Sequence, residues 1–139
     1  MSTFLEASTP PSGSVQPNAN IVLLNVPCDP TVIVTDAVKM VAGVAFKAFA
    51  DVVGNSNLIG IVQFKSSSVL CDIRVVGVTP AIFTGLDETK EYYLSTVTPG
   101  LVVSETIATG GAGSVIIRVG QPFSSTEMFV TKGLRIIRG

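Results

Sequence analysis

Short apolar segments, separated at even intervals by turn-forming residues, constrain this chain most strongly. The clearest segment spans residues 69–77, where Asp72 and Arg74 fall on one side of a strict two-residue alternation. That alternation is typical of a β-strand. Further β segments are predicted at residues 21–24, 31–34, 37–40, 44–50, 58–64, 92–95, 101–103, 114–119, 127–130 and 134–137. This spacing predicts an all-β fold, a small antiparallel β-barrel or sandwich.

The stretch 36–53 is the one place where helix and strand compete. Several Ala, Lys and Met residues would suit a helix on propensity. Gly43 interrupts the stretch, however, and Val44 and Phe46 are poor choices for a helix. We therefore predict two strands, 37–40 and 44–50, that are joined by a tight turn at 41–43. Gly60 is expected to mark a bulge in the next strand.

The first twenty residues differ from the rest and divide the chain into an arm, 1–20, and a single β domain, 21–139. The arm is rich in Pro, Ser and Asn, which cannot form a helix interior or a central strand. Two alternatives remain open: a terminus without fixed structure, or an extended arm that lies on a neighbour through Phe4, Leu5 and Val15. The start lacks the features of a secretory signal, so we expect the protein to be made and kept in the cytosol.

The chain is poor in charge for its size. Only 14% of its 139 residues are charged, against about 25% in an average domain, while 47% are hydrophobic. A chain of this composition is expected to cover part of its surface with partners, although an apolar monomer remains the alternative. The net charge is −1 and the nine Lys and Arg residues are scattered, which argues against nucleic acid as a partner. No apolar run approaches 18 residues, so no membrane span is predicted.

The residue types that usually carry catalysis are scarce. The chain has no histidine, the commonest general base and zinc ligand. We therefore predict no enzymatic activity, no metal site and no cofactor. Its two cysteines, Cys28 and Cys71, are predicted to be buried free thiols rather than a disulfide, because a cytosolic protein is kept reduced.

Two local patterns allow a binding interpretation that we do not favour. The Gly-rich segment 110–114 lacks the Lys and the helix of a phosphate-binding loop, so a hairpin loop is the better prediction. Asp87, Glu88 and Glu91 could in principle hold calcium, but their spacing matches no known loop and Lys90 lies among them. A solvated turn is predicted there.

A series of motifs in the second half resembles a known family. Tyr92-Tyr-Leu-Ser95 is followed by Thr98-Pro-Gly100, then by Val119-Gly-Gln121 and Ser124-Ser-Thr126. In this order they resemble the C-terminal β-domain of many tailed-bacteriophage virion proteins, and the outline of the resemblance extends over residues 35–138.

The resemblance implies structural roles for nine residues and transfers no catalytic residue. It implies turns at Gly85, Pro99, Gly100 and Gly120, where the glycines would take backbone angles that other residues resist. The implied core residues are Leu86, Tyr93, Leu94, Val119 and Phe129.

The resemblance also implies a function. The chain is expected to be a structural protein of the virion, assembled in the host cytoplasm. A compact domain without heptads or a Gly-x-y repeat fits a capsid decoration or accessory protein better than a fibre shaft. Its expected partners are two further copies, in a homotrimer, and other virion proteins such as the major capsid protein. The alternatives are a tail, collar or fibre component and a module that binds host glycans.

Overall fold

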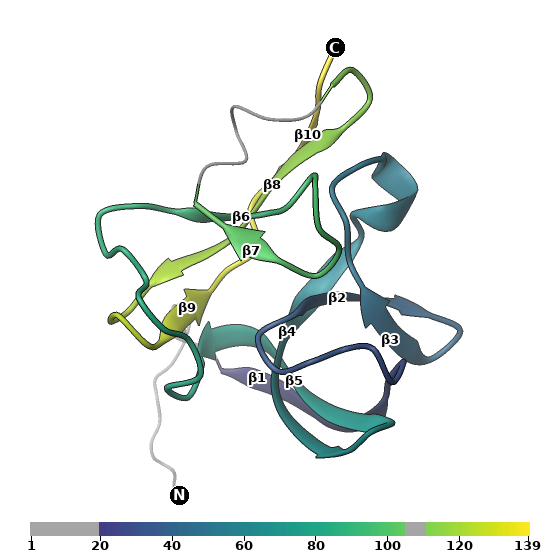
Figure 1. Cartoon of the computed structure of the whole chain (residues 1–139), viewed down its shortest axis with the longest axis vertical. Helices are drawn as coiled ribbons and strands as arrows, with labels where there is room; N and C mark the ends of the chain where they lie inside the picture. Colours follow the sequence, from purple (N-terminus) through teal and green to yellow (C-terminus); the bar gives the residue numbers. More distant parts are fainter. Residues whose placement is uncertain (1–19, 105–110) are drawn as a thin grey trace, which may run out of the picture.

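The computed structural model describes residues 20–104 and 111–139, and these form an all-β fold, as the sequence predicts (Figure 1). The antiparallel sheet curls into a half-barrel. Its strands are β1 (Ile21–Pro27), β2 (Ala37–Val41), β3 (Val44–Lys47), β4 (Leu58–Ser67), β5 (Leu70–Val78), β6 (Tyr92–Leu94), β7 (Val102–Val103), β8 (Val115–Pro122), β9 (Met128–Val130) and β10 (Arg135–Ile137). A short 3-10 helix, η1 (Val53–Asn55), precedes β4. Phe4, Leu5 and Val15 of the predicted arm lie outside the described residues.

The strands divide into two halves that meet at β5. β1 and β4 pair with the first part of β5, and β2 and β3 continue the sheet beyond β4. Just after β1, Cys28 forms a bridge to Ala45 of β3, which joins the two ends of this five-stranded group. We call β1–β5 the closed half. The last two residues of β5, Gly77 and Val78, pair instead with β9, which leads into β8, β6 and β7, with β10 on β8. We call β6–β10 the open half.

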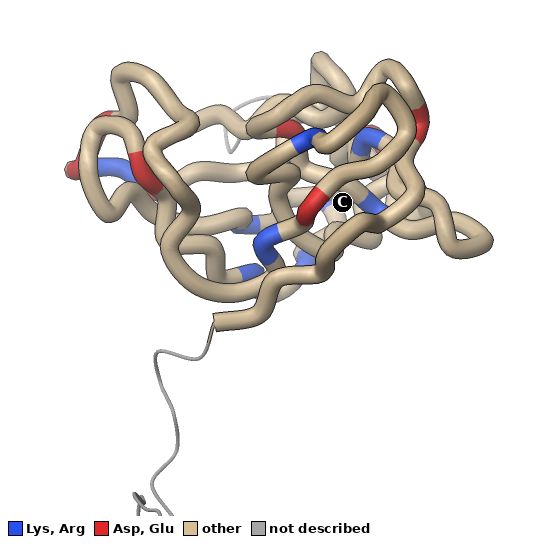
Figure 2. Tube along the Cα trace, turned by 90° about the horizontal axis from the view of Figure 1, so that it is seen from below, with Lys and Arg blue, Asp and Glu red and all other residues tan. Residues whose placement is uncertain are grey.

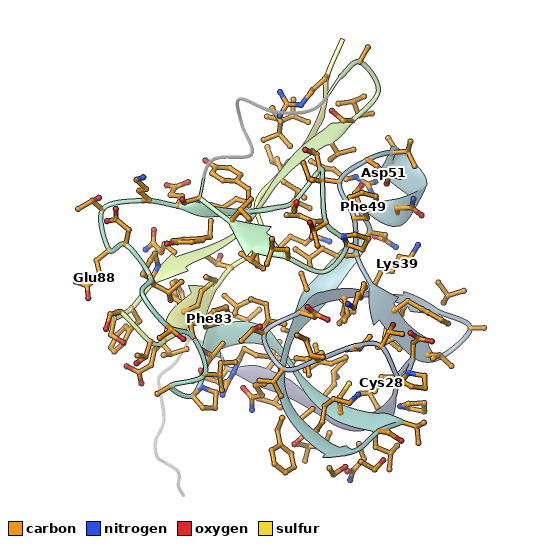
Figure 3. The ribbon with its side chains drawn as sticks, viewed as in Figure 1. Cys28, Lys39, Phe49, Asp51, Phe83 and Glu88 are labelled. Carbon is orange, nitrogen blue, oxygen red and sulfur yellow. The ribbon has the colours of Figure 1, made fainter. Side chains whose placement is uncertain are left out.

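Each half has its own apolar core, and side chains fill the inside of both in Figure 3. In the closed half, Val62 and Ile73 are fully buried beside both cysteines. In the open half, Leu94, Ile117 and Met128 are fully or almost fully buried, and the half-buried Phe83 packs against them. The larger core of the open half also includes residues of β2 and β4, so residues of both halves pack together in it.

The predicted hairpin in the stretch 36–53 is present as β2 and β3. Ala42 and Gly43 form its two-residue loop, and both have positive φ, 51° and 81°. Positive φ at both loop residues matches the turn that suits the twist of paired strands. β3 ends at Lys47, three residues earlier than predicted, because the Phe49 N–H bonds to the carbonyl of Asn55 at 2.8 Å.

The β-branched run 31–34 is not a strand, which corrects the sequence prediction. Asp29 accepts a hydrogen bond from the Thr31 N–H at 3.2 Å, and Asp36 accepts one from the Ile33 N–H at 2.9 Å. These carboxylates take the place of a neighbouring strand and turn the chain. Val32 is nevertheless fully buried in the core of the closed half.

Two of the five predicted core residues lie on the wrong face of their strands. Leu94 and Val119 are fully buried, and Leu86 is half-buried against the same core. Tyr93 is only half-buried, whereas its neighbour Tyr92 is buried and its hydroxyl accepts a hydrogen bond from the Asp87 N–H at 2.9 Å. Phe129 is likewise half-buried between two buried neighbours, Met128 and Val130. Adjacent strand residues face opposite sides, so the inward position belongs to the neighbour in each case.

The predicted turn glycines are required for two different reasons: some have positive φ, and one lies against a neighbouring strand. Gly85 and Gly100 have positive φ, 67° and 80°, and the adjoining Pro99 is exposed in the same turn. Gly120, in contrast, has no positive φ and lies inside β8, which corrects the prediction of a turn. A Cβ on Gly120 would lie 2.3 Å from the carbonyl oxygen of Phe129, so close packing of β8 on β9 explains the residue.

Candidate assembly surface

The described surface carries many large apolar side chains that are well exposed. They occur on both halves of the domain, at Ile21, Leu24, Ile33, Val41, Val52, Val53, Phe64, Val69, Val97, Leu101, Phe123, Leu134, Ile136 and Ile137. Scattered single apolar residues are normal on a protein surface. The last three are different because they fall within four consecutive positions.

These three residues lie in β10 or directly before it, and β10 pairs with residues 115–117 of β8. We call residues 134–137 and 115–117 together the ribbon. The ribbon lies at the end of the domain marked C in Figure 1. Leu134 is 89% exposed, and Ile136 and Ile137 are each 57% exposed. Ile136 and Ile137 are adjacent, so they point to opposite faces and the ribbon is apolar and exposed on both. Two-stranded ribbons are marginally stable by themselves, which makes this one a candidate contact surface.

A groove of about 480 Å³ runs along one face of the ribbon, and we call it the ribbon groove. Its lining includes Tyr93 of β6, Ile116 and Arg118 of β8, and Leu134 and Ile136. The outward positions of three neighbouring strands therefore meet in one mainly apolar surface. Tyr93, which the resemblance assigned to the core, lies here instead.

The polar edge of the ribbon groove is a small cluster around Glu91. Glu91 Oε1 lies 3.7 Å from Arg118 Nη1 and accepts a hydrogen bond from the Tyr93 hydroxyl at 3.4 Å. Desolvation and the nearby Glu91 charge raise the pKa of Tyr93, so the phenol stays protonated. The Arg118 Nε atom is buried without a hydrogen-bond partner. This cluster holds charges in place but contains no activated nucleophile.

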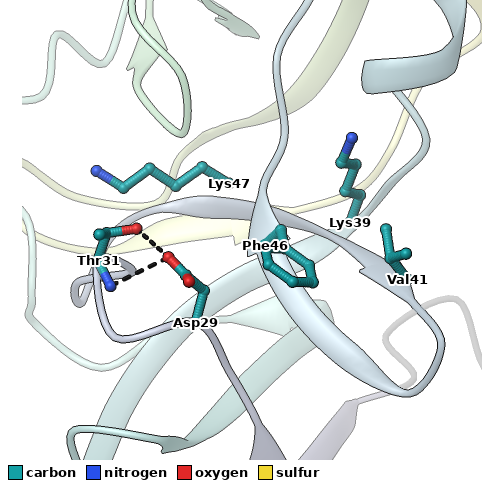
Figure 4. A pocket seen from close by; sticks show the side chains of 6 residues that line it. All are labelled: Asp29, Thr31, Lys39, Val41, Phe46 and Lys47. Atoms are coloured by element: carbon teal, nitrogen blue, oxygen red, sulfur yellow. Dashed lines mark hydrogen bonds between the residues drawn. The ribbon is translucent and has the colours of Figure 1, made fainter.

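A second groove, of about 440 Å³, lies on the β2–β3 hairpin (Figure 4). In Figure 4 the Phe46 ring lies between the Asp29–Thr31 turn and Val41. Lys39 and Lys47 complete the lining. Their ammonium groups have partners inside the domain: Lys39 Nζ donates to Asn55 Oδ1 at 2.9 Å, and Lys47 Nζ lies 3.7 Å from Asp36 Oδ2.

The predicted solvated turn at 87–91 is organised by its own side chains. Asp87 Oδ1 accepts hydrogen bonds from the Thr89 hydroxyl at 2.6 Å and from the Thr89 N–H at 2.9 Å. These hydrogen bonds lower the pKa of Asp87. Glu88 points away from the domain in Figure 3. Within residues 20–104 and 111–139, no cluster of three or more His, Cys, Asp or Glu residues could hold a metal ion.

The two cysteines lie together in the core of the closed half and are free thiols. Burial, and the neighbouring Cys28 thiol, raise the pKa of Cys71 to about 12. A thiol with so high a pKa is inert as a nucleophile at neutral pH because the reactive species is the thiolate. Their role in the described structure is packing.

Sequence reasoning missed the exposed residues of the ribbon, although a signal for them exists. In Leu134-Arg-Ile-Ile137 the two isoleucines break the alternation of apolar and polar residues. In a strand this places one apolar side chain on each face, which requires cover on both. The sequence predicts a strand at 134–137 but does not determine how many strands lie beside it.

Lys and Arg are intermixed with Asp and Glu along the described trace (Figure 2). Among the described residues there is no helix that is long and apolar enough to span a bilayer. Comparison of the chain with protein-family models, curated proteins and solved structures found no match.

Proposed function

We propose that this chain is a structural virion protein of a tailed bacteriophage, specifically a capsid decoration or accessory protein. It would stabilise the particle as a homotrimer in contact with the major capsid protein, without catalysis. The observation that carries the assembly part is the ribbon, whose Leu134, Ile136 and Ile137 are exposed on both faces. The motifs that resemble phage β-domains, such as Tyr92-Tyr-Leu-Ser95, support the virion part.

The composition and the sheet edges support the same proposal. The surface has few charges and several large exposed apolar residues. Exposure of these residues to water is unfavourable for a protein that stays monomeric. Within the described residues, β7 pairs only with β6 and β10 pairs only with β8. An unpaired strand edge is a template for another strand, and a protein that assembles can use it.

The proposal is tested by mass and by particle binding. Sedimentation of the purified protein should show a species of three times 14.4 kDa. The protein should also bind to phage particles that were assembled without it. A protein that remains a monomer at all concentrations and does not bind these particles would contradict the proposal. A low-resolution map of particles with this chain labelled would distinguish the capsid from the tail, collar or fibre.

Binding of a host glycan is the second candidate, and the groove on the β2–β3 hairpin is the observation that favours it. An aromatic ring, Phe46, lies there beside hydrogen-bonding groups of Asp29 and Thr31. Sugar-binding sites often combine a ring face with such polar groups. A glycan array is the test: specific binding that is lost in Phe46→Ala would favour this candidate over assembly.

A further inference from the structure

The outer edge of β10 offers backbone hydrogen-bonding groups in a defined pattern. The Arg138 N–H bonds to the Ser114 carbonyl at 2.9 Å, and the Arg138 carbonyl accepts from Gly113 N–H at 3.0 Å. Residue 138 therefore directs its backbone N–H and C=O groups toward β8. In an antiparallel pair this orientation alternates, so residue 136 also faces β8, while Arg135 and Ile137 direct their N–H and C=O groups outward. No described strand occupies that outer edge.

The alternation limits how a second copy of this strand could pair with the first. Under a two-fold axis, a residue whose N–H and C=O groups point outward must lie opposite another residue of that kind. Within β10, three registers satisfy this rule: those centred on Arg135, on Ile136 or on Ile137. A register between two residues would place an outward group opposite an inward one, so it cannot form the hydrogen bonds.

The residues that would lie opposite each arginine favour one of the three registers. Centring on Arg135 places that guanidinium directly opposite its own copy, which is unfavourable. Centring on Ile137 places Arg135 opposite Gly139, which has no side chain for the arginine stem to cover. Centring on Ile136 pairs Ile136 with itself, Arg135 with Ile137, and Leu134 with Arg138. Every arginine then lies opposite an aliphatic side chain, which its methylene stem can cover.

We propose that β10 of one copy pairs with β10 of a second copy across a two-fold axis centred on Ile136, forming a continuous sheet between the two domains. The inference rests on the proposed assembly function and adds a contact to it. A two-fold axis joins two copies, so within a homotrimer this contact would link one trimer to the next. The ribbon lies at one end of the domain (Figure 1).

The contact should be weak by itself. Five paired residues on each side bury less than the roughly 800 Å² per partner of a stable complex. The facing strands also carry Arg135 and Arg138 from both copies, and these like charges repel. Pairing should therefore strengthen as salt screens the repulsion. Many weak contacts on one particle reinforce each other through effective concentration.

Cysteine cross-linking tests both the contact and its register. Ile136→Cys places two thiols directly opposite each other at a non-hydrogen-bonded pair, where the Cα atoms are about 4.5 Å apart and a disulfide can close. Mild oxidation of the purified variant with oxidised glutathione should give a covalent dimer, more rapidly at high salt. Ile137→Cys is the matched control because its two copies would lie diagonally, about 7–8 Å apart, and should cross-link at least tenfold more slowly. The unmodified protein should give no covalent dimer, since Cys28 and Cys71 are buried.

The possible outcomes separate this inference from the proposed function. If Ile136→Cys does not cross-link faster than Ile137→Cys, the inference is wrong, even if the unmodified protein binds particles. If Ile137→Cys is the faster variant, the contact is centred on Ile137 and the inference as stated is also wrong. Rapid cross-linking of Ile136→Cys in a protein that never binds particles would support the contact and contradict the virion function.

A backbone variant provides a check that needs no thiol. Ile137→Pro removes an outward N–H without removing a bond to β8, so the domain should keep its stability while the unmodified edge contact is lost. Ile137→Thr, which retains the N–H, is its control. Weak dimerisation in sedimentation equilibrium should be lost in the first variant and retained in the second. Equal dimerisation of the two variants would contradict the contact.

Discussion

The two halves of this domain contain similar strands but end them differently. In the closed half, the bridge between Cys28 and Ala45 joins the chain after β1 to β3, so the last strand edge is covered. In the open half, β7 and β10 each have one described partner, and β10 exposes apolar side chains on both faces. Under the proposed function, this difference would be a division of roles: the closed half stabilises the fold, and the open half presents a surface for partners.

The largest expected difference between the halves is in thiol reactivity. Cys28 and Cys71 are buried in the closed half, and the pKa of Cys71 is raised to about 12. A disulfide reagent at neutral pH should therefore modify them at least about a thousandfold more slowly in the folded protein than in denaturant. In denaturant, two thiols per chain should react without reductant. Fast modification of the folded protein would contradict a tightly closed half.

The same truncation should have very different effects on stability in the two halves. Ile73 is fully buried, so Ile73→Ala should lower the free energy of unfolding by about 2–5 kcal/mol. Ile136→Ala removes the same atoms from a side chain that is 57% exposed, and should change it by less than about 0.5 kcal/mol in dilute monomer. Urea titration of both variants measures this. Similar losses in the two would remove the distinction between core and contact surface.

Close packing within the open half can be tested at Gly120. A Cβ there would meet the Phe129 carbonyl oxygen at 2.3 Å, so Gly120→Ala must move β8 away from β9 and should cost about 1–3 kcal/mol. Gly111→Ala is a matched control because no atom lies within 4 Å of its added Cβ. Thermal unfolding compares the two. A neutral Gly120→Ala would show that β8 and β9 are not closely packed at this point.

The smallest expected effect concerns Asp36, which lies where the halves meet beside Gly100. Burial raises the pKa of Asp36, partly offset by the Ile33 N–H and Lys47. The folded protein then binds this proton more tightly than the unfolded chain, so the cost of burying the charge disappears as the pH falls toward 3.8.

The test compares the native protein with Asp36→Asn, which does not titrate. The difference in unfolding free energy should shift in favour of the native protein between about pH 7 and about pH 4. A shift in the opposite direction would mean that the ion pair with Lys47, at 3.7 Å, outweighs burial.

Local patterns in the sequence predicted much of the fold. The alternation in residues 69–77 became β5, and Gly43 marked the turn between β2 and β3. The prediction failed at 31–34, because Asp29 and Asp36 bond to the backbone there and replace a strand partner. β-Branched residues indicate what a pleated surface tolerates, and they do not reveal which groups compete for its hydrogen bonds.

Properties that depend on the pairing of distant strands could not be predicted. Alternation within a strand places Tyr92 and Tyr93 on opposite faces. The pairing of β6 with β8, which is irregular between these two residues, decides which one is buried. Likewise, β5 changes partners near Gly77, whose φ is 111°, and this bend separates the two halves. The exposed state of Leu134 and Ile136 follows from the number of strands beside β10, which is a property of the whole sheet.

Sedimentation velocity over a range of concentrations tests the central claim, that the open half is an assembly surface. The unmodified protein should form species heavier than the 14.4 kDa monomer as its concentration rises. Leu134→Ser combined with Ile136→Ser should reduce these species at least tenfold while the unfolding midpoint stays within a few degrees. If the unmodified protein remains a monomer throughout, or if the double variant assembles equally well, the open half is not an assembly surface.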